Sequence, residues 1–175
     1  ALLKHSEDYN IKIRKVYSDS PEEVKELIYP IDCMDTDYAR KWKELDYKAN
    51  PIPIQDTEYN TDNGECVRSK SEMNIANALF KYGAIYLYEA PVTLKNGKTV
   101  YPDFTIINVK QRKVIYWEHR GMMDDREYAK NAVRKVKDYM KNGIIPGDNL
   151  ILTEETQSSP LGTDEINSII QTFLI

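Results

Sequence analysis

The sequence predicts a mixed α/β fold: a helix, a three-strand antiparallel meander, a second helix and a further strand, preceded by a small helical extension. Apolar and polar residues alternate over residues 84–119, in runs separated by turn residues, which is typical of an antiparallel sheet. The segments on either side begin with helix-capping residues and carry apolar residues at helical spacing. These observations together favour one α/β domain.

Residues 1–62 are predicted to form an acidic helical extension and a linker. Ser20-Pro21-Glu22-Glu23 is a capping box with proline at the first helical position, so a helix should run to about residue 29. A second helix is expected over residues 35–47, and residues 51–64 indicate an extended linker. We therefore place a boundary near Asn63, and one domain over residues 63–175.

The elements of the second domain follow from their start and stop residues. Ser69-x-x-Glu72 is a capping box for a helix that stops at Gly83. Asn96-Gly97 predicts a hairpin between the runs 84–94 and 99–109, and a turn at residues 110–111 leads to a third strand. A long helix over about 124–142, a short strand over 149–153 and a helix from about 163 complete the domain.

Alternation assigns the side chains of the meander to two faces. One face is apolar and the other carries tyrosines and carboxylates. We expect Ile85, Leu87, Phe104, Ile106, Ile115 and Trp117 on the first face, and Tyr86, Tyr88, Asp103, Thr105, Tyr116 and Glu118 on the second.

Two of these carboxylates are predicted to face each other. With an even-numbered loop at residues 110–111, Asn108 pairs with Lys113, and the same register puts Asp103 opposite Glu118. Cross-strand neighbours lie about 5 Å apart at Cβ, where two like charges are destabilising unless a cation or a proton lies between them. A register shifted by one residue would separate the two carboxylates and leave a purely structural domain.

Glu72 is a third candidate carboxylate. It lies on the stripe of its helix that Ile75, Ala76 and Leu79 form, so it should point toward the core. The alternative is that Glu72 serves the N-terminus of its own helix as the last residue of the capping box.

Three converging acidic side chains favour a site for Mg²⁺ or Mn²⁺. Two cysteines and two histidines are too few for a zinc site or a disulfide framework. A divalent ion of this kind binds phosphate oxygens and activates water, which makes phosphodiester hydrolysis the natural reaction. The sequence has no glycine-rich phosphate loop, serine-hydrolase elbow or zinc-protease helix motif.

These residues resemble the PD-(D/E)xK nuclease superfamily, which includes type II restriction enzymes and Holliday-junction resolvases. The resemblance rests on Glu72, Tyr101-Pro102-Asp103 and Glu118-His119-Arg120, and on the element order over about residues 66–153. It implies a restriction-endonuclease-like core and an Mg²⁺- or Mn²⁺-dependent endonuclease, with DNA favoured over RNA. Asp103, Glu118 and the backbone carbonyl of His119 would hold the metal, and Glu72 would be an auxiliary ligand or orient the water.

The last residue of the motif departs from the family pattern. The superfamily usually has lysine where Arg120 stands, and arginine keeps its charge but cannot help to deprotonate water. Either Arg120 acts electrostatically, or a lysine from elsewhere replaces it. Lys135 is the first candidate, at the edge of the apolar face that we expect Ala129, Val133, Val136 and Met140 to form, and Lys70 is the second.

The long helix also carries a basic stripe. Five basic residues recur at steps of three or four and occupy a sector about 80° wide. A phosphate backbone or simply solvent would suit such a surface. The stripe consists of Arg126, Lys130, Arg134, Lys137 and Lys141.

Charge and hydropathy limit the remaining classes. The net charge is −4, and the acidity lies in residues 1–62, with 9 Lys and Arg against 14 Asp and Glu. No apolar run approaches the roughly 20 residues that cross a bilayer, so we expect no membrane contact. The two scattered cysteines make a reducing cytoplasm the expected location. The first residues lack an initiator Met and a signal pattern, which suggests a fragment of a longer protein.

A catalytically impaired module that binds nucleic acid or a protein is the alternative function.

Overall fold

The computed structural model describes residues 12, 15–28, 35–54 and 59–174. The chain divides into two compact units, residues 1–44 and 45–175. The first unit contains α2 (Glu22–Ile28) and α3 (Asp35–Lys43). A helix therefore begins just after Ser20-Pro21 as predicted, although its expected end near residue 29 lies outside the described residues, and α3 ends before residue 47.

The second unit begins at residue 45, earlier than the predicted boundary near Asn63. The reason is a set of hydrogen bonds that attaches residues 47–53 to the domain. Tyr47 donates to the backbone oxygen of Tyr88 at 2.9 Å, and the guanidinium of Arg68 donates to the backbone oxygens of residues 52 and 53. Residues 55–58 of the predicted linker lie outside the described residues.

A four-stranded sheet forms the centre of the second unit. Its order is β3 (Ile85–Tyr88), β6 (Phe104–Asn108), β7 (Lys113–Arg120) and β8 (Leu150–Glu154). The first three strands are antiparallel, and β8 pairs with β7 in parallel. The predicted mixed α/β fold and the order helix, meander, helix, strand are confirmed. A separate two-stranded sheet pairs β1 (Tyr59–Asn60) with β2 (Cys66–Val67).

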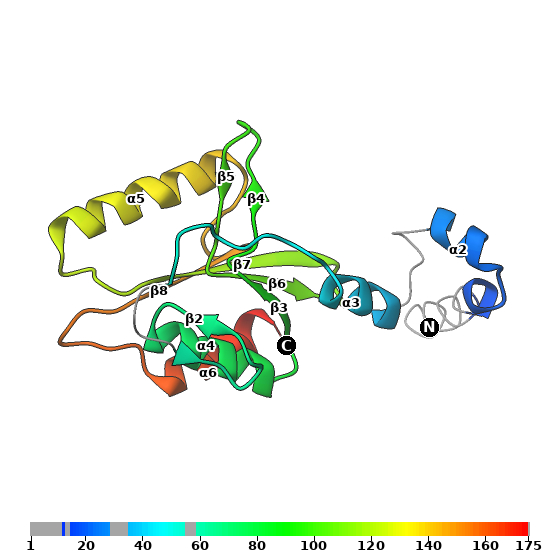
Figure 1. Ribbon diagram of the computed structural model, residues 1–175, viewed down its shortest axis with the longest axis horizontal. Helices are drawn as coiled ribbons and strands as arrows, with labels where there is room; N and C mark the ends of the chain where they lie inside the picture. The colour runs from blue at the N-terminus through cyan, green and yellow to red at the C-terminus, as the bar shows by residue number, and fades with distance from the viewer. Residues whose placement is uncertain (1–11, 13–14, 29–34, 55–58, 175) are drawn as a thin grey trace, which may run out of the picture. The chain divides into compact units, whose positions relative to one another are not determined.

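Helices cover both faces of this sheet (Figure 1). α5 (Arg126–Lys141) lies on one face, and α4 (Lys70–Lys81) and α6 (Thr163–Phe173) lie on the other. Within the described residues, no helix is both long enough and apolar enough to cross a bilayer.

Two apolar clusters correspond to the two faces of the sheet. The larger one joins α4 and α6 to the sheet, and its fully buried members include Ile75, Leu79, Phe104, Ile106, Trp117, Ile166 and Ile170. The smaller one lies under α5 and consists of Leu94, Val100, Tyr139, Ile144 and Leu150. Burial of this apolar surface is the main favourable contribution to folding.

The register of β6 and β7 is the predicted one. Asn108 pairs with Lys113, and the pairing continues without a slip to Phe104 opposite Trp117. Asp103 and Glu118 are the next residues outward from this last pair. The alternative of a shifted register, which would separate the two carboxylates, is therefore excluded.

The register of β3 and β6 differs from the prediction. Tyr86 pairs with Ile106 and Tyr88 with Phe104, so both tyrosines share the apolar face of the sheet toward α4. Ile85 and Leu87 pair with Ile107 and Thr105 and lie on the opposite face. The expected faces of the β3 residues were therefore wrong.

The turn at the tip of this hairpin explains the difference. Its loop has three residues, 95–97, between β4 (Val92–Thr93) and β5 (Thr99–Val100), rather than the two residues Asn96-Gly97. Leu94 donates its backbone N–H to Lys98, and its backbone oxygen accepts from Gly97, whose φ is +82°. A three-residue loop with glycine in the left-handed region shifts the pairing by one residue, which moves every β3 side chain to the other face.

We predict that Gly97→Ala lowers the free energy of unfolding by about 1 kcal/mol, because an L residue with Cβ is strained at this positive φ. No atom lies within 4 Å of the position that a Cβ would take, so the cost is backbone strain rather than a clash. Urea unfolding would measure it, with Lys95→Ala in the same turn as the control. Equal stability of both variants would contradict the turn geometry.

Candidate functional site

Asp103 and Glu118 meet on the face of the sheet that α5 covers. Asp103 directly precedes β6, where its backbone oxygen accepts from the N–H of Glu89 at 2.9 Å. Its Oδ2 accepts a hydrogen bond of 2.6 Å from the backbone N–H of His119, the residue after Glu118. Glu118 is 6% exposed. The strand pairing thus brings both carboxylates to one end of the sheet.

α5 places two side chains on Glu118. The ammonium of Lys135 contacts Oε1, and the hydroxyl of Tyr139 donates to Oε2 at 3.1 Å. Lys135 therefore points toward the sheet, as proposed for the lysine that replaces the motif residue. Its side chain is 39% exposed, whereas Tyr139 is fully buried. Lys135 is thus partly exposed to solvent while its ammonium contacts the buried carboxylate of Glu118.

Burial favours the protonated forms of both acids, and the charge of Glu118 adds to this effect at Asp103. Burial, followed by the charge of Glu118, raises the pKa of Asp103 well above its usual range, although Lys135 and the His119 N–H partly oppose this. Burial also raises the pKa of Glu118, against the opposing effects of Lys135 and Tyr139. Burial alone would lower the pKa of Lys135, but the two carboxylates outweigh it and raise that pKa.

Glu72 serves its own helix and the adjacent strand. Its backbone N–H donates to Ser69, which caps α4, and its Oε2 accepts from Tyr88 at 2.6 Å and from the N–H of Arg68 at 3.1 Å. The capping role is thus present. Its charge nevertheless contributes to the raised pKa of Asp103, so Glu72 acts on the site at longer range.

The two other residues of the motif lie at the end of β7. Arg120 pairs with Glu154 of the neighbouring β8, and burial lowers the pKa of its guanidinium. The imidazole of His119 points to the opposite face, where Nδ1 lies 3.0 Å from the hydroxyl of Thr153 and Nε2 lies 3.3 Å from Glu155. The imidazole is therefore not a member of the carboxylate site.

The donors at this site are hard oxygen ligands. Among the residues that the structure describes, no three His, Cys, Asp or Glu side chains gather closely enough to hold a metal ion. The predicted convergence of Glu72 with Asp103 and Glu118 is therefore not observed, because Glu72 is held by its cap. The buried Glu118 and the partly buried Asp103 are oxygen ligands of the kind that Mg²⁺ and Mn²⁺ take.

The basic stripe on α5 is exposed along its whole length but faces away from the carboxylates. At about 100° per residue, the centre of the stripe lies roughly 140° from Lys135 and 180° from Tyr139. The expected apolar face was wrong in its direction, because Val133 is 45% and Met140 48% exposed. Lys70, the second candidate lysine, is also exposed.

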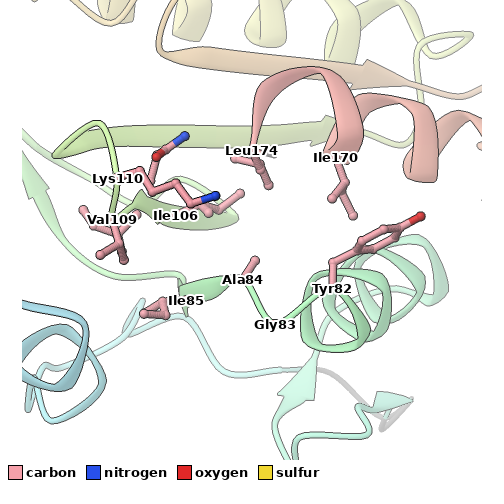
Figure 2. Close-up of a pocket in the computed structure, with 11 residues that line it drawn as sticks. Tyr82, Gly83, Ala84, Ile85, Ile106, Val109, Lys110, Ile170 and Leu174 are labelled. Atoms are coloured by element: carbon pink, nitrogen blue, oxygen red, sulfur yellow. The ribbon is translucent and has the colours of Figure 1, made fainter. Parts of the chain in front are cut away.

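A cavity of about 310 Å³ opens at the other end of the sheet (Figure 2). It lies between the C-terminal ends of α4 and α6 and the strand ends near Ala84 and Val109. Mostly apolar residues line it, with Tyr82 and Lys110 as its titratable groups. It lacks acidic residues, so it cannot supply the carboxylate chemistry of the site.

Sequence reasoning missed two tyrosines of the site. Tyr128, Lys135 and Tyr139 follow one another at spacings of seven and four, which puts them in a sector about 40° wide. Tyr139 binds Glu118, and the hydroxyl of Tyr128 accepts from the N–H of Gly121, just after the end of β7. This spacing could have identified the side of α5 that faces the sheet, because a line of polar side chains on a buried helix face needs buried polar partners.

We predict that Asp103→Asn raises the melting temperature at neutral pH in chelator-containing buffer. The pKa of Asp103 is higher in the folded protein than the value of about 3.9 in the unfolded chain. Asp103 therefore contributes its full stabilisation below about pH 3.9 and loses it as the pH rises through the folded-state pKa. The asparagine variant lacks this loss and still accepts the His119 N–H. The difference should be small near pH 4 and grow toward neutral pH, and a constant difference would contradict the raised pKa.

Part of this chain is similar to a curated protein. An uncharacterized protein of Methanocaldococcus jannaschii is 35% identical over 111 residues, which are 62% of this chain. The chain spans 9% of the length of that relative. No protein-family model and no solved structure matches the chain.

Proposed function

We propose that this chain is a divalent-metal-dependent nuclease with a restriction-endonuclease-like core of the PD-(D/E)xK type. The observation that carries the proposal is the pair of carboxylates, the buried Glu118 and the partly buried Asp103, with the ammonium of Lys135 on Glu118. Burial raises the pKa values of both acids. Perturbed acids of this kind are typical of functional sites.

The position of the pair in the fold also supports the proposal. Asp103 stands before the second strand of the meander and Glu118 near the end of the third, between a first helix and a crossover helix. The element order and the residues Pro102-Asp103 and Glu118-His119-Arg120 are those on which the resemblance rests.

Asp103, Glu118 and the backbone carbonyl of His119 would hold Mg²⁺ or Mn²⁺. When bound, the ion supplies a Lewis acid that lowers the pKa of water and draws charge from the phosphate. Tyr139 keeps Glu118 in its orientation through the 3.1 Å hydrogen bond, and the N–H of His119 does the same for Asp103. Glu72 and its capping contacts fix the start of α4 near this end of the sheet.

Lys135 fits the place of the missing motif lysine better than Arg120 does. Its ammonium touches Glu118 and is partly exposed, so it can reach a phosphate or an attacking water beside the carboxylates. Arg120 is held by Glu154 and keeps its charge. We assign Lys135 to orienting the water and offsetting charge, and Arg120 to electrostatic stabilisation of the phosphate.

We predict that the protein cleaves nucleic acid with Mg²⁺ or Mn²⁺, and that Asp103→Asn and Glu118→Gln each lower the rate at least 1000-fold. Lys135→Ala should lower it by about 100-fold, as expected for one lost transition-state contact. Cleavage of single- and double-stranded DNA and RNA would be compared among identically purified variants. Asp164→Asn and Glu165→Gln, exposed acids at the start of α6, are the matched controls.

Equal cleavage by all variants would mean a contaminating nuclease. No cleavage by any of them, with salt-sensitive nucleic-acid binding retained, would instead favour an impaired binding module. The arginine in the motif position motivates that second function.

We also predict that the basic stripe contributes to affinity and not to the chemical step. The double variant Lys130→Gln, Lys137→Gln should bind nucleic acid more weakly. It should also reduce the slope of log affinity against log salt concentration by about two, because each lysine releases counterions when it contacts a phosphate. The cleavage rate at saturating substrate should not change, since the stripe faces away from Lys135. Lys81→Gln with Lys110→Gln is the control pair, and an equal loss of affinity in both pairs would contradict a role for the stripe.

A further inference from the structure

Three further groups lie near the carboxylate site. Tyr139 and Glu118 are buried. Lys135, Arg120 and Tyr128 each interact electrostatically with Glu118. Two of these three carry a positive charge and the third is a phenol, so the surroundings suit an anion bound next to a metal held by two acids.

Tyr128 is the outermost member of the inward face of α5. It lies two turns before Lys135 on the same side of the helix, toward the end at which β7 leaves the sheet. Asp125 caps this end of α5 by accepting the N–H of Tyr128 at 2.7 Å, which fixes the backbone from which the ring projects. The hydroxyl of Tyr128 lies 3.3 Å from the N–H of Gly121, so the ring is beside the end of β7.

The hydroxyl of Tyr128 has a proton available for a ligand. Its oxygen accepts the N–H of Gly121 at 3.3 Å, and this contact uses a lone pair and leaves the O–H free to donate. The charges of Asp103, Glu118 and Lys135 affect the pKa of Tyr128, and Tyr128 in turn affects the pKa of Arg120. Burial, followed by the two carboxylates, raises the pKa of Tyr128, so it is a donor at neutral pH.

We infer that Tyr128 donates a hydrogen bond to a phosphodiester oxygen in a subsite that it forms with Lys135 and Arg120. This inference rests on the proposed function for the class of its ligand. It adds a neutral, directional donor between two cations, which fixes the orientation of the phosphate in a way that charges alone do not. The exposed basic stripe cannot do this, because it lies on the far side of α5.

The test is the binding of dimethyl phosphate in the presence of Mg²⁺, followed by the line width of its phosphorus NMR signal. Tyr128→Phe keeps the ring and removes the hydroxyl. Tyr82→Phe is the matched control, because the hydroxyl of Tyr82 also accepts a long bond, of 3.4 Å from Gln171, at the opposite end of the domain. Binding is compared below the melting temperatures of all three proteins.

The expected result is an affinity about tenfold lower in the Tyr128→Phe variant and unchanged in the Tyr82→Phe variant, as for the loss of one hydrogen bond to a charged group. Equal affinity of the Tyr128→Phe variant and the wild type, or no binding by the wild type, would overturn the inference. Cleavage assays separate this result from the proposed function. Cleavage that does not depend on Tyr128 would contradict the subsite and leave the proposed nuclease function intact. Binding that depends on Tyr128, without any cleavage, would contradict the proposed hydrolysis and support the subsite.

Discussion

The placement of two carboxylates next to each other at one end of the sheet is the constraint on which the rest of this site depends. The β6–β7 register brings Asp103 next to Glu118, and the hydrogen bond from His119 to Asp103 holds them there. Two neighbouring negative charges are unfavourable, so the fold must supply positive charge or protons. α5 supplies the ammonium of Lys135, and the pKa values of both acids are still raised, first by burial and, for Asp103, also by the charge of Glu118.

The sequence was sufficient for the parts of the fold that local rules determine. Capping residues predicted where α2 and α4 begin, and the β6–β7 register followed because the loop before Lys113 has an even number of residues, as expected. The register of β3 failed because Asn96-Gly97 suits both a two-residue and a three-residue loop, and the two loops differ by one residue in pairing. The domain boundary failed for another reason: the attachment of residues 47–53 depends on Arg68 and the Tyr88 backbone, which are distant in sequence.

The candidate site shows the same division between local and tertiary information. Asp103 and Glu118 followed from strand register, whereas Lys135 reaches Glu118 from another side of α5 than the apolar edge on which it was expected. The direction of α5 was misjudged because its apolar residues are outnumbered by charged ones, and its buried side proved to be the stripe of Tyr128, Lys135 and Tyr139. A polar inward face is uncommon, and only the buried acids opposite it explain why it forms. Glu72 caps α4, which was one of its two expected roles. It does not join the two other carboxylates, but its charge still raises the pKa of Asp103.

The most direct test of the account is the stoichiometry of Mn²⁺ binding, measured by the loss of the free-ion signal in electron paramagnetic resonance. This measurement requires no substrate and no knowledge of the polymer that is cleaved. The account predicts that the wild-type chain at neutral pH binds Mn²⁺ and that Asp103→Asn and Glu118→Gln each abolish or greatly weaken this binding, whereas Glu165→Gln does not. Absence of binding by the wild type, or equal binding by all four proteins, would contradict the claim that these two carboxylates form a metal site.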